Sequence, residues 1–195
     1  MASTISAGTT SGTAIAIAGD TTGNLAFTTQ AGTYTQTLPN ATGTVMVSGN
    51  MPAFSAYGNA DQVIANTTYT KVQYNVKSSP GFDTNSCYDT SNYRFTPTVA
   101  GYYLINAYTE WQGSASTALR SVNLYKNGSA IRRSQTISYA TSGNTGNAFT
   151  GMVYLNGSTD YVEIYVVQAT GGNLSIYNGN GSNYNWFEGY LARLA

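Results

Sequence analysis

From residue 52 onward, the chain alternates between two sets of side chains with the two-residue period of β-strands. In the clearest run, which follows Gly101, one set of positions is Tyr103, Ile105 and Ala107, and the other is Tyr102, Leu104, Asn106 and Tyr108. Both sets are largely apolar. We therefore expect this strand to be buried on both sides, or to turn one side towards a partner subunit.

The same pattern recurs along the second half of the chain. Lys126-Asn127-Gly128 predicts a hairpin turn, because Asn and Gly both tolerate positive φ. Between such turns we predict strands at Thr67–Val76, Leu119–Tyr125, Phe149–Leu155, Tyr161–Gln168, Leu174–Tyr177 and Trp186–Ala192. In the fourth of these, Val162, Ile164 and Val166 are expected to face the core. No segment sustains the 3.6-residue period of a helix, so the pattern indicates an all-β sandwich or barrel.

Residues 1–50 have a different composition from residues 51–195. Thr, Ser, Gly and Ala dominate them, and Asp20 is their one charged residue. Short extended pieces are predicted at Ala14–Ala18, Leu25–Thr29, Tyr34–Leu38 and Thr44–Val47. Such strands have few large side chains and need a partner surface to offset the entropy of the chain. We expect an extended β-rich arm that becomes ordered against neighbouring subunits; the alternative is a disordered low-complexity tail.

Charge is scarce in this sequence. Only 8% of the 195 residues are charged and the net charge is zero, which favours association over steering of a charged ligand. The one adjacent basic pair, Arg132-Arg133, does not make the basic patch that nucleic-acid binding requires. There is no basic leader at the N-terminus and no apolar run long enough for a membrane span. We therefore expect neither a signal peptide nor a nucleic-acid or membrane partner.

The residues available for chemistry are few. The chain has one cysteine, Cys87, and no histidine, which excludes intrachain disulfides, Cys/His zinc sites and histidine-dependent nucleophiles. Carboxylate pairs remain at Asp83 with Asp89 and at Glu110 with Glu188, but the first pair lies in a polar loop where Asp serves turns. We expect no enzyme, no cofactor and no metal; the alternative is calcium held by Asp83 and Asp89.

Tyrosine is abundant, with 17 residues. Most are expected in the core or at a subunit interface, where Tyr103 and Tyr161 are the candidates. Tyr139, Tyr177 and Tyr184 instead lie among Ser, Asn and Gly. Rigid aromatic rings beside adaptable polar groups are typical of recognition loops for glycans or proteins, although such tyrosines also simply pack long loops.

Several short motifs occur in a familiar order: a Tyr-Asp turn at Tyr88-Asp89, then RFTP, AGYYLINA, LYKNG, LNGSTDYVEIYV and FEGYLARL. Over about residues 52–195 they resemble the jelly-roll superfamily of the complement first-component globular heads and the tumour-necrosis-factor cytokines. The resemblance implies a ten-strand jelly-roll β-sandwich that forms a compact homotrimer through aromatic faces. Animal members usually carry a collagen stalk. This chain has no Gly-X-Y repeat, so their immune and hormonal roles are not expected to transfer.

The arm resembles, in composition, the N-terminal segments of bacteriophage virion proteins. We therefore expect two domains, an attachment arm (1–50) and a jelly-roll head (51–195). The leading hypothesis is a homotrimeric capsid decoration or cement protein, made in the host cytoplasm and bound on the virion to the major capsid protein or another virion protein. The alternatives are a tail-fibre or receptor-binding tip that recognises a host surface glycan, and a secreted lectin-like module.

Overall fold

A computed structural model describes residues 46–195 other than 115, 138–142 and 180–183. The chain divides into two compact units, residues 1–42 and 43–195, and the description below concerns the second. The strands predicted in the arm up to residue 45, and the candidate Tyr139, lie outside the described residues. No helix in the described part of the chain is long and apolar enough to cross a membrane.

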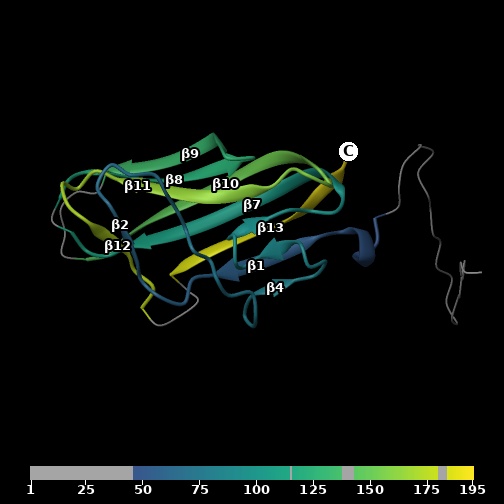
Figure 1. Ribbon diagram of the computed structural model, residues 1–195, viewed down its shortest axis with the longest axis horizontal. Helices are drawn as coiled ribbons and strands as arrows, with labels where there is room; N and C mark the ends of the chain where they lie inside the picture. The colour runs from purple at the N-terminus through teal and green to yellow at the C-terminus, as the bar shows by residue number, and fades with distance from the viewer. Residues whose placement is uncertain (1–45, 115, 138–142, 180–183) are drawn as a thin grey trace, which may run out of the picture. The chain divides into compact units, whose positions relative to one another are not determined.

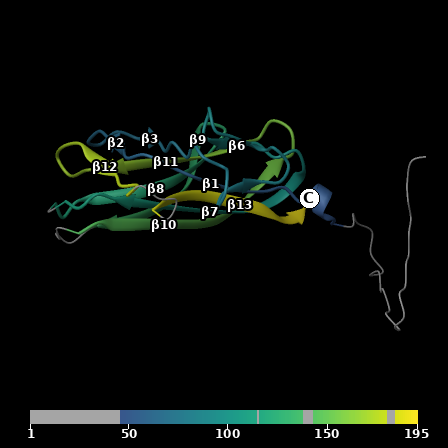
Figure 2. The same ribbon diagram turned by 90° about the horizontal axis from the view of Figure 1, so that it is seen from below.

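The described residues form two antiparallel sheets that pack face to face (Figures 1 and 2). Sheet A has the order β2-β12-β7-β13-β1-β4, and β10 pairs with β7 as well. Its strands are β1 (Ala53–Tyr57), β2 (Gln62–Ile64), β4 (Phe82–Asp83), β7 (Ala100–Trp111), β10 (Thr145–Asn156), β12 (Leu174–Ile176) and β13 (Asn185–Leu194). A single 3-10 turn, η1 (Ser48–Asn50), precedes them among the described residues.

Sheet B has the order β5-β6-β11-β8-β9, and β3 also pairs with β11. Its strands are β3 (Thr70–Lys71), β5 (Tyr88–Asp89), β6 (Arg94–Phe95), β8 (Leu119–Lys126), β9 (Ser129–Ile137) and β11 (Val162–Gln168). The chain changes sheet between β7 and β8, between β9 and β10, and between β10 and β11. This crossing of two antiparallel sheets confirms the predicted jelly-roll sandwich.

The local predictions fare differently at turns and at sheet edges. Asn127 and Gly128 have φ of 52° and 79°, as expected for the tight turn between β8 and β9. The predicted strand at Thr67–Val76 shrinks to β3. It pairs with β11 at Thr70 and Lys71 and then leaves sheet B, and Val76 pairs with Tyr57 of sheet A instead. The segment therefore connects the two sheets and cannot remain one strand.

An aromatic cluster forms the core between the sheets. Phe54 of β1 stacks on Phe95 at a centroid distance of 4.3 Å and on Tyr88 at 5.1 Å, and it meets the edge of Phe187 at 4.8 Å. From sheet B, Val162, Ile164 and Val166 contribute fully buried side chains, as predicted. Both sheets therefore rest on one shared core, and their outer faces are the surfaces left for function.

Candidate functional site

The outer face of sheet A carries two groups of large apolar and aromatic side chains, with a polar row of Thr150, Asn106 and Glu188 between them. We call this surface the aromatic face; its residues are Tyr102, Leu104 and Tyr108 of β7, Met152 and Tyr154 of β10, and Trp186 and Tyr190 of β13. Met152 is 51% exposed and Tyr190 is 47% exposed, although both side chains are largely apolar. Exposed apolar patches of this kind mark interaction sites on soluble proteins.

The strand register sets these side chains in rows across β10, β7 and β13. Tyr154 lies opposite Tyr102, with ring centroids 5.6 Å apart. The next row sets Met152 opposite Leu104, and Leu104 opposite Tyr190. Because paired residues on neighbouring strands point to the same side of a sheet, the rows form one surface.

A further row completes the face towards the other end of β7. Tyr108 lies opposite Trp186, and their rings stack at 6.0 Å with an interplanar angle of 18°. Between this row and the Leu104 row, Asn106, Glu188 and Tyr190 border a shallow depression of about 190 Å³. A flat apolar surface with one small depression suits a complementary protein surface better than a small ligand, which prefers a deep pocket.

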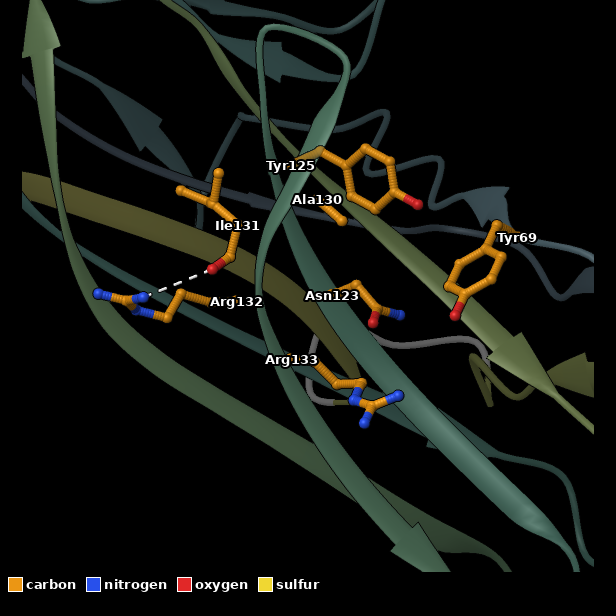
Figure 3. Close-up of a pocket in the computed structure, with 7 residues that line it drawn as sticks. All are labelled: Tyr69, Asn123, Tyr125, Ala130, Ile131, Arg132 and Arg133. Atoms are coloured by element: carbon orange, nitrogen blue, oxygen red, sulfur yellow. Dashed lines mark hydrogen bonds between the residues drawn. The ribbon is translucent and has the colours of Figure 1, made fainter.

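The outer face of sheet B has a different character. A recess of about 320 Å³ opens there, and we call it the Tyr–Arg recess; its lining residues are Tyr69, Asn123, Tyr125, Ala130, Ile131, Arg132 and Arg133. Figure 3 shows Arg133 on the same side of β9 as Asn123 and Tyr69, whereas Arg132 points to the other side. No ion pair in the described part of the chain includes either arginine.

The surroundings of the recess are aromatic and charged. Tyr165 stacks on Tyr125 at 4.1 Å, and Lys71 Nζ lies 5.9 Å from the Tyr165 ring centroid. Lys71 also forms an ion pair with Glu163 at 2.5 Å. Burial raises the pKa of Tyr125, and the neighbouring Tyr69 and Tyr165 hydroxyls add to the increase. Tyr125 therefore stays neutral, and the recess offers a ligand ring faces and the Arg133 guanidinium, which forms no ion pair among the described residues.

The two predicted interface residues lie apart. Tyr103 is fully buried in the core, where its hydroxyl donates to the carbonyl oxygen of Val99 at 2.7 Å. The choice of Tyr103 as an interface residue is therefore wrong. The alternation separates the two sides of β7 correctly, but the side with Tyr103 faces the core and the side with Tyr102 faces outward. Tyr161 immediately precedes β11 of sheet B, with the Arg94 guanidinium 4.7 Å from its ring centroid. It is not part of the aromatic face.

The two described loop candidates lie together. Tyr177 and Tyr184 meet edge to face at 5.3 Å, and both rings lie close to Gly179, which has a φ of 48°. Both rings remain partly exposed. Their role in recognition stays a prediction.

The candidate calcium ligands are engaged separately. Asp83 pairs with Lys77 at 2.7 Å and accepts hydrogen bonds from the backbone N–H groups of Cys87 and Tyr88. Asp89 accepts from Ser91 and Asn92 within its own turn; these hydrogen bonds, led by the Asn92 side chain, lower the pKa of its carboxyl. Within the described ranges, no three His, Cys, Asp or Glu residues gather where they could hold a metal ion.

Other residues of the two surfaces were not singled out from the sequence. Met152 and Tyr154 of the aromatic face, and Tyr69, Asn123 and Tyr125 of the recess, are examples. For β10 a signal existed, because Met152 and Tyr154 alternate with the buried Val153 and Leu155. The recess had no such signal, since it depends on how the segment before β3 and the β8–β9 hairpin are placed on the two sides of β11.

No protein-family model matches the chain, and no curated protein sequence does either. Among solved structures, the chain is similar to "Eiger TNF from S. frugiperda", with a TM-score of 0.53 and 10% identity over 74% of this chain and 93% of that one. Two crystal structures of murine APRIL give TM-scores of 0.48 and 0.49 at 11% and 10% identity, each over 72% of this chain and 98% of theirs. The first similarity supports the jelly-roll fold and, at this identity, the fold alone.

Proposed function

We propose that this protein is a structural subunit, not an enzyme, and that it forms a homotrimer through the aromatic face of sheet A. The observation that carries the proposal is the exposure of Tyr102, Met152, Tyr154 and Tyr190 on neighbouring strands. Water contact with such a surface is unfavourable by about 25 cal/mol for each Å² of apolar area. Burial against further copies of the same chain removes that cost. Three-fold assembly is what the sequence resemblance implies, and the similarity to a tumour-necrosis-factor-type fold agrees with it.

The setting we propose is a bacteriophage particle. Residues 1–50, with one charge and many Thr, Ser, Gly and Ala residues, would attach the head to the major capsid protein or another virion protein. A trimer placed at three-fold positions of the shell would act as a decoration or cement protein. The support for this setting is the composition of the arm together with a head that exposes an aromatic face.

Sedimentation of the full-length protein tests the assembly. We expect the mass of three chains at micromolar concentration. Leu104→Glu places a charge in the middle of the aromatic face and should weaken association at least about 100-fold, as expected at the centre of an interface. Ile131→Glu, on the outer face of sheet B, is the matched control and should leave the mass unchanged. A monomeric wild-type protein would exclude the proposal.

Attachment needs its own experiment. Full-length protein and a chain without residues 1–42 are mixed with particles that lack the protein and are imaged by electron cryo-microscopy. The cut precedes Met46, which packs against the core, so the head keeps its packing. We expect density at three-fold positions with the full-length chain and none with the shortened one. Density at the tail alone would replace decoration by the receptor-binding alternative.

The Tyr–Arg recess favours a second candidate function, recognition of a host surface glycan by a tail-fibre or receptor-binding tip. Tyr69 and Tyr125 offer ring faces for stacking against a sugar, and Arg133 offers donors for its hydroxyl or carboxylate oxygens. A glycan array with wild-type protein and Arg133→Met tests this candidate. Loss of an acidic-glycan signal in the variant, with unchanged mass, would support it; absence of any glycan signal from the wild type would oppose it.

A further inference from the structure

A buried arginine lies at the end of the sandwich where β2 and β12 extend sheet A, because Gln168, which is paired with it, donates to the carbonyl oxygen of Ile64 of β2. Arg120 is the second residue of β8, and only 1% of its surface is exposed. It alternates with Val122 and Leu124, which are fully buried core residues of the same strand. An arginine side chain cannot lose its proton in a protein. The interior at this end therefore contains a full positive charge.

The guanidinium has no hydrogen-bond partner among the described residues. Nε, Nη1 and Nη2 are all buried and all unpaired. Gln168 lies opposite Arg120 on β11, but its amide is used elsewhere. Its Nε2 donates to the carbonyl oxygens of Ile64 and Gly172, and its Oε1 accepts from the backbone and hydroxyl of Thr170. Gln168 therefore cannot satisfy the arginine, and its other cross-strand neighbour, Thr136 of β9, is exposed.

Nor does a carboxylate neutralise the charge. The three ion pairs among the described residues are Lys71–Glu163, Lys77–Asp83 and Lys126–Asp160. The stretches 115, 138–142 and 180–183 contain no Asp or Glu in the sequence. Burial lowers the pKa of the Arg120 guanidinium, as expected for a cation without an anionic neighbour.

A second unpaired polar group lies at the same end, on the opposite sheet. The hydroxyl of Thr145, the first residue of β10, is buried and has no hydrogen-bond partner among the described residues. Thr145 shares its side of the strand with Asn147, two residues later. Asn147 accepts from Trp111 Nε1 at 2.9 Å and donates to the backbone carbonyl of Arg120 at 3.4 Å. Asn147 therefore connects β10 to β8 at Arg120, and Thr145 lies on the same side of β10 two residues away.

We infer that Arg120 and Thr145 form an internal binding site for a small inorganic anion, a halide or an oxyanion. The guanidinium supplies the charge and up to five N–H donors, and the Thr145 hydroxyl supplies a neutral donor from the other sheet. A buried charge without a partner is costly enough that buried charges in proteins are nearly always paired. A bound anion would pair it and join the two sheets at this end.

Thermal unfolding of the full-length protein tests the site. Chloride, bromide and phosphate are each titrated against gluconate at constant ionic strength, so that halide and oxyanion are distinguished. Above the dissociation constant, each tenfold increase of the preferred anion should raise the Tm by roughly 3–5 °C. Arg120→Met and Thr145→Val should flatten this dependence, the first completely. Arg132→Met, an exposed arginine on β9, is the matched control and should behave like the wild type.

Crystals of the wild-type protein soaked in bromide give an independent readout. An anomalous peak within hydrogen-bond distance of the Arg120 guanidinium would establish the halide site even if Arg120→Met did not fold. Phosphate density at the same place would establish the oxyanion. A Tm that responds equally to all salts in the wild type and in Arg120→Met, or wild-type crystals with neither ion beside Arg120, would overturn the inference.

Discussion

The two sheets turn tyrosine-rich outer faces to the solvent, but the neighbours of the tyrosines differ. On sheet A, Tyr102 and Tyr154 lie beside Leu104 and Met152. On sheet B, Tyr125 and Tyr165 lie beside Lys71, Glu163 and Arg133, and Arg133 forms no ion pair within the described ranges. The first arrangement favours permanent burial of its apolar rows, and the polar row of Thr150, Asn106 and Glu188 crosses it. The second offers charge and hydrogen bonds, which suits a ligand that comes and goes.

Strand geometry accounts for much of this difference. β7 and β10 pair along twelve residues without interruption, which makes a broad and regular surface. In sheet B the register of β8 and β9 shifts between Leu124 and Tyr125. A bulge bends a strand and re-aims its side chains. The bend lies directly at the lining of the Tyr–Arg recess, so a hollow forms where sheet A has a flat face.

The largest effect should follow from a change in the core that supports both faces. Phe54→Ala removes a ring that contacts Phe95, Tyr88 and Phe187. We expect a loss of about 3–5 kcal/mol in the free energy of unfolding, because the site cannot collapse around the cavity. Urea denaturation measures it, with Phe54→Leu as the milder control. If Phe54→Ala lost association but kept its stability, the idea that one core holds both sheets in place would be contradicted.

A smaller loss is expected from the charged side of the comparison. Lys71→Met leaves the Glu163 carboxylate, which is 4% exposed, without its ion-pair partner. We expect a loss of about 1–3 kcal/mol in the free energy of unfolding, less than for a fully buried pair because Lys71 is partly exposed. Adding Glu163→Gln should restore part of it, and the trimer mass should not change. Equal stability of Lys71→Met and the wild type would show that the pair contributes nothing.

The sequence predicted most of the strands because their signals are local. The alternation around β7, the three buried residues of β11 and the Asn-Gly turn each depend on a few neighbouring residues. Which side of β7 faces the core is not local. Tyr102 and Tyr103 are the same residue type, and the choice depends on partner strands, such as the burial of Tyr103 against Phe95 of sheet B.

The functional surfaces were less accessible to sequence reasoning than the strands were. The doubly apolar character of β7 did predict either burial on both sides or a face for a partner, and the aromatic face agrees with the second alternative. The alternation through Val122 and Leu124 also places Arg120 on the inner side of β8. From the sequence alone, however, an arginine near the start of a strand is expected to be exposed to solvent. Its lack of a partner could not be predicted, because the residues around it belong to β9 and β11 of its own sheet and to β10 of the other.

Acid should weaken a contact that links the two sheets. Asp160, which precedes β11, pairs with Lys126 of β8 at 2.8 Å and accepts from the Asn127 side chain and the Asn156 backbone. These contacts, led by the Lys126 hydrogen bond, lower the pKa of its carboxyl. The stabilisation is therefore complete above the ordinary Asp pKa of about 4 and is lost as pH falls through the folded-state value.

Urea denaturation between pH 6 and pH 2 measures this loss. Asp160→Asn should show a shallower decline of stability below about pH 4 than the wild type. Some decline should remain, because the pKa of Asp89 is lowered as well. Lys126→Met should fall between the two, since the hydrogen bonds from Asn127 and Asn156 persist. Identical profiles for wild type and Asp160→Asn would exclude Asp160 as a source of the acid sensitivity.

The smallest change in stability should come from a substitution of Gly146 of β10. This substitution moves a ring of the aromatic face without changing any residue of that face. A Cβ atom added there would lie 2.0 Å from the Tyr108 hydroxyl, so the Tyr108 ring must move from its stack on Trp186. Gly146→Ala should change the free energy of unfolding by no more than about 0.5 kcal/mol, because the restriction that Ala places on the unfolded chain offsets the cost of displacing the Tyr108 ring. Association should weaken several-fold, as measured by sedimentation equilibrium. Gly172→Ala, where an added Cβ meets nothing within 4 Å, is the matched control. If Gly146→Ala associated as tightly as the control, the Tyr108–Trp186 row would lie outside the contact, and the interface would be confined to the rows of Tyr102 and Leu104.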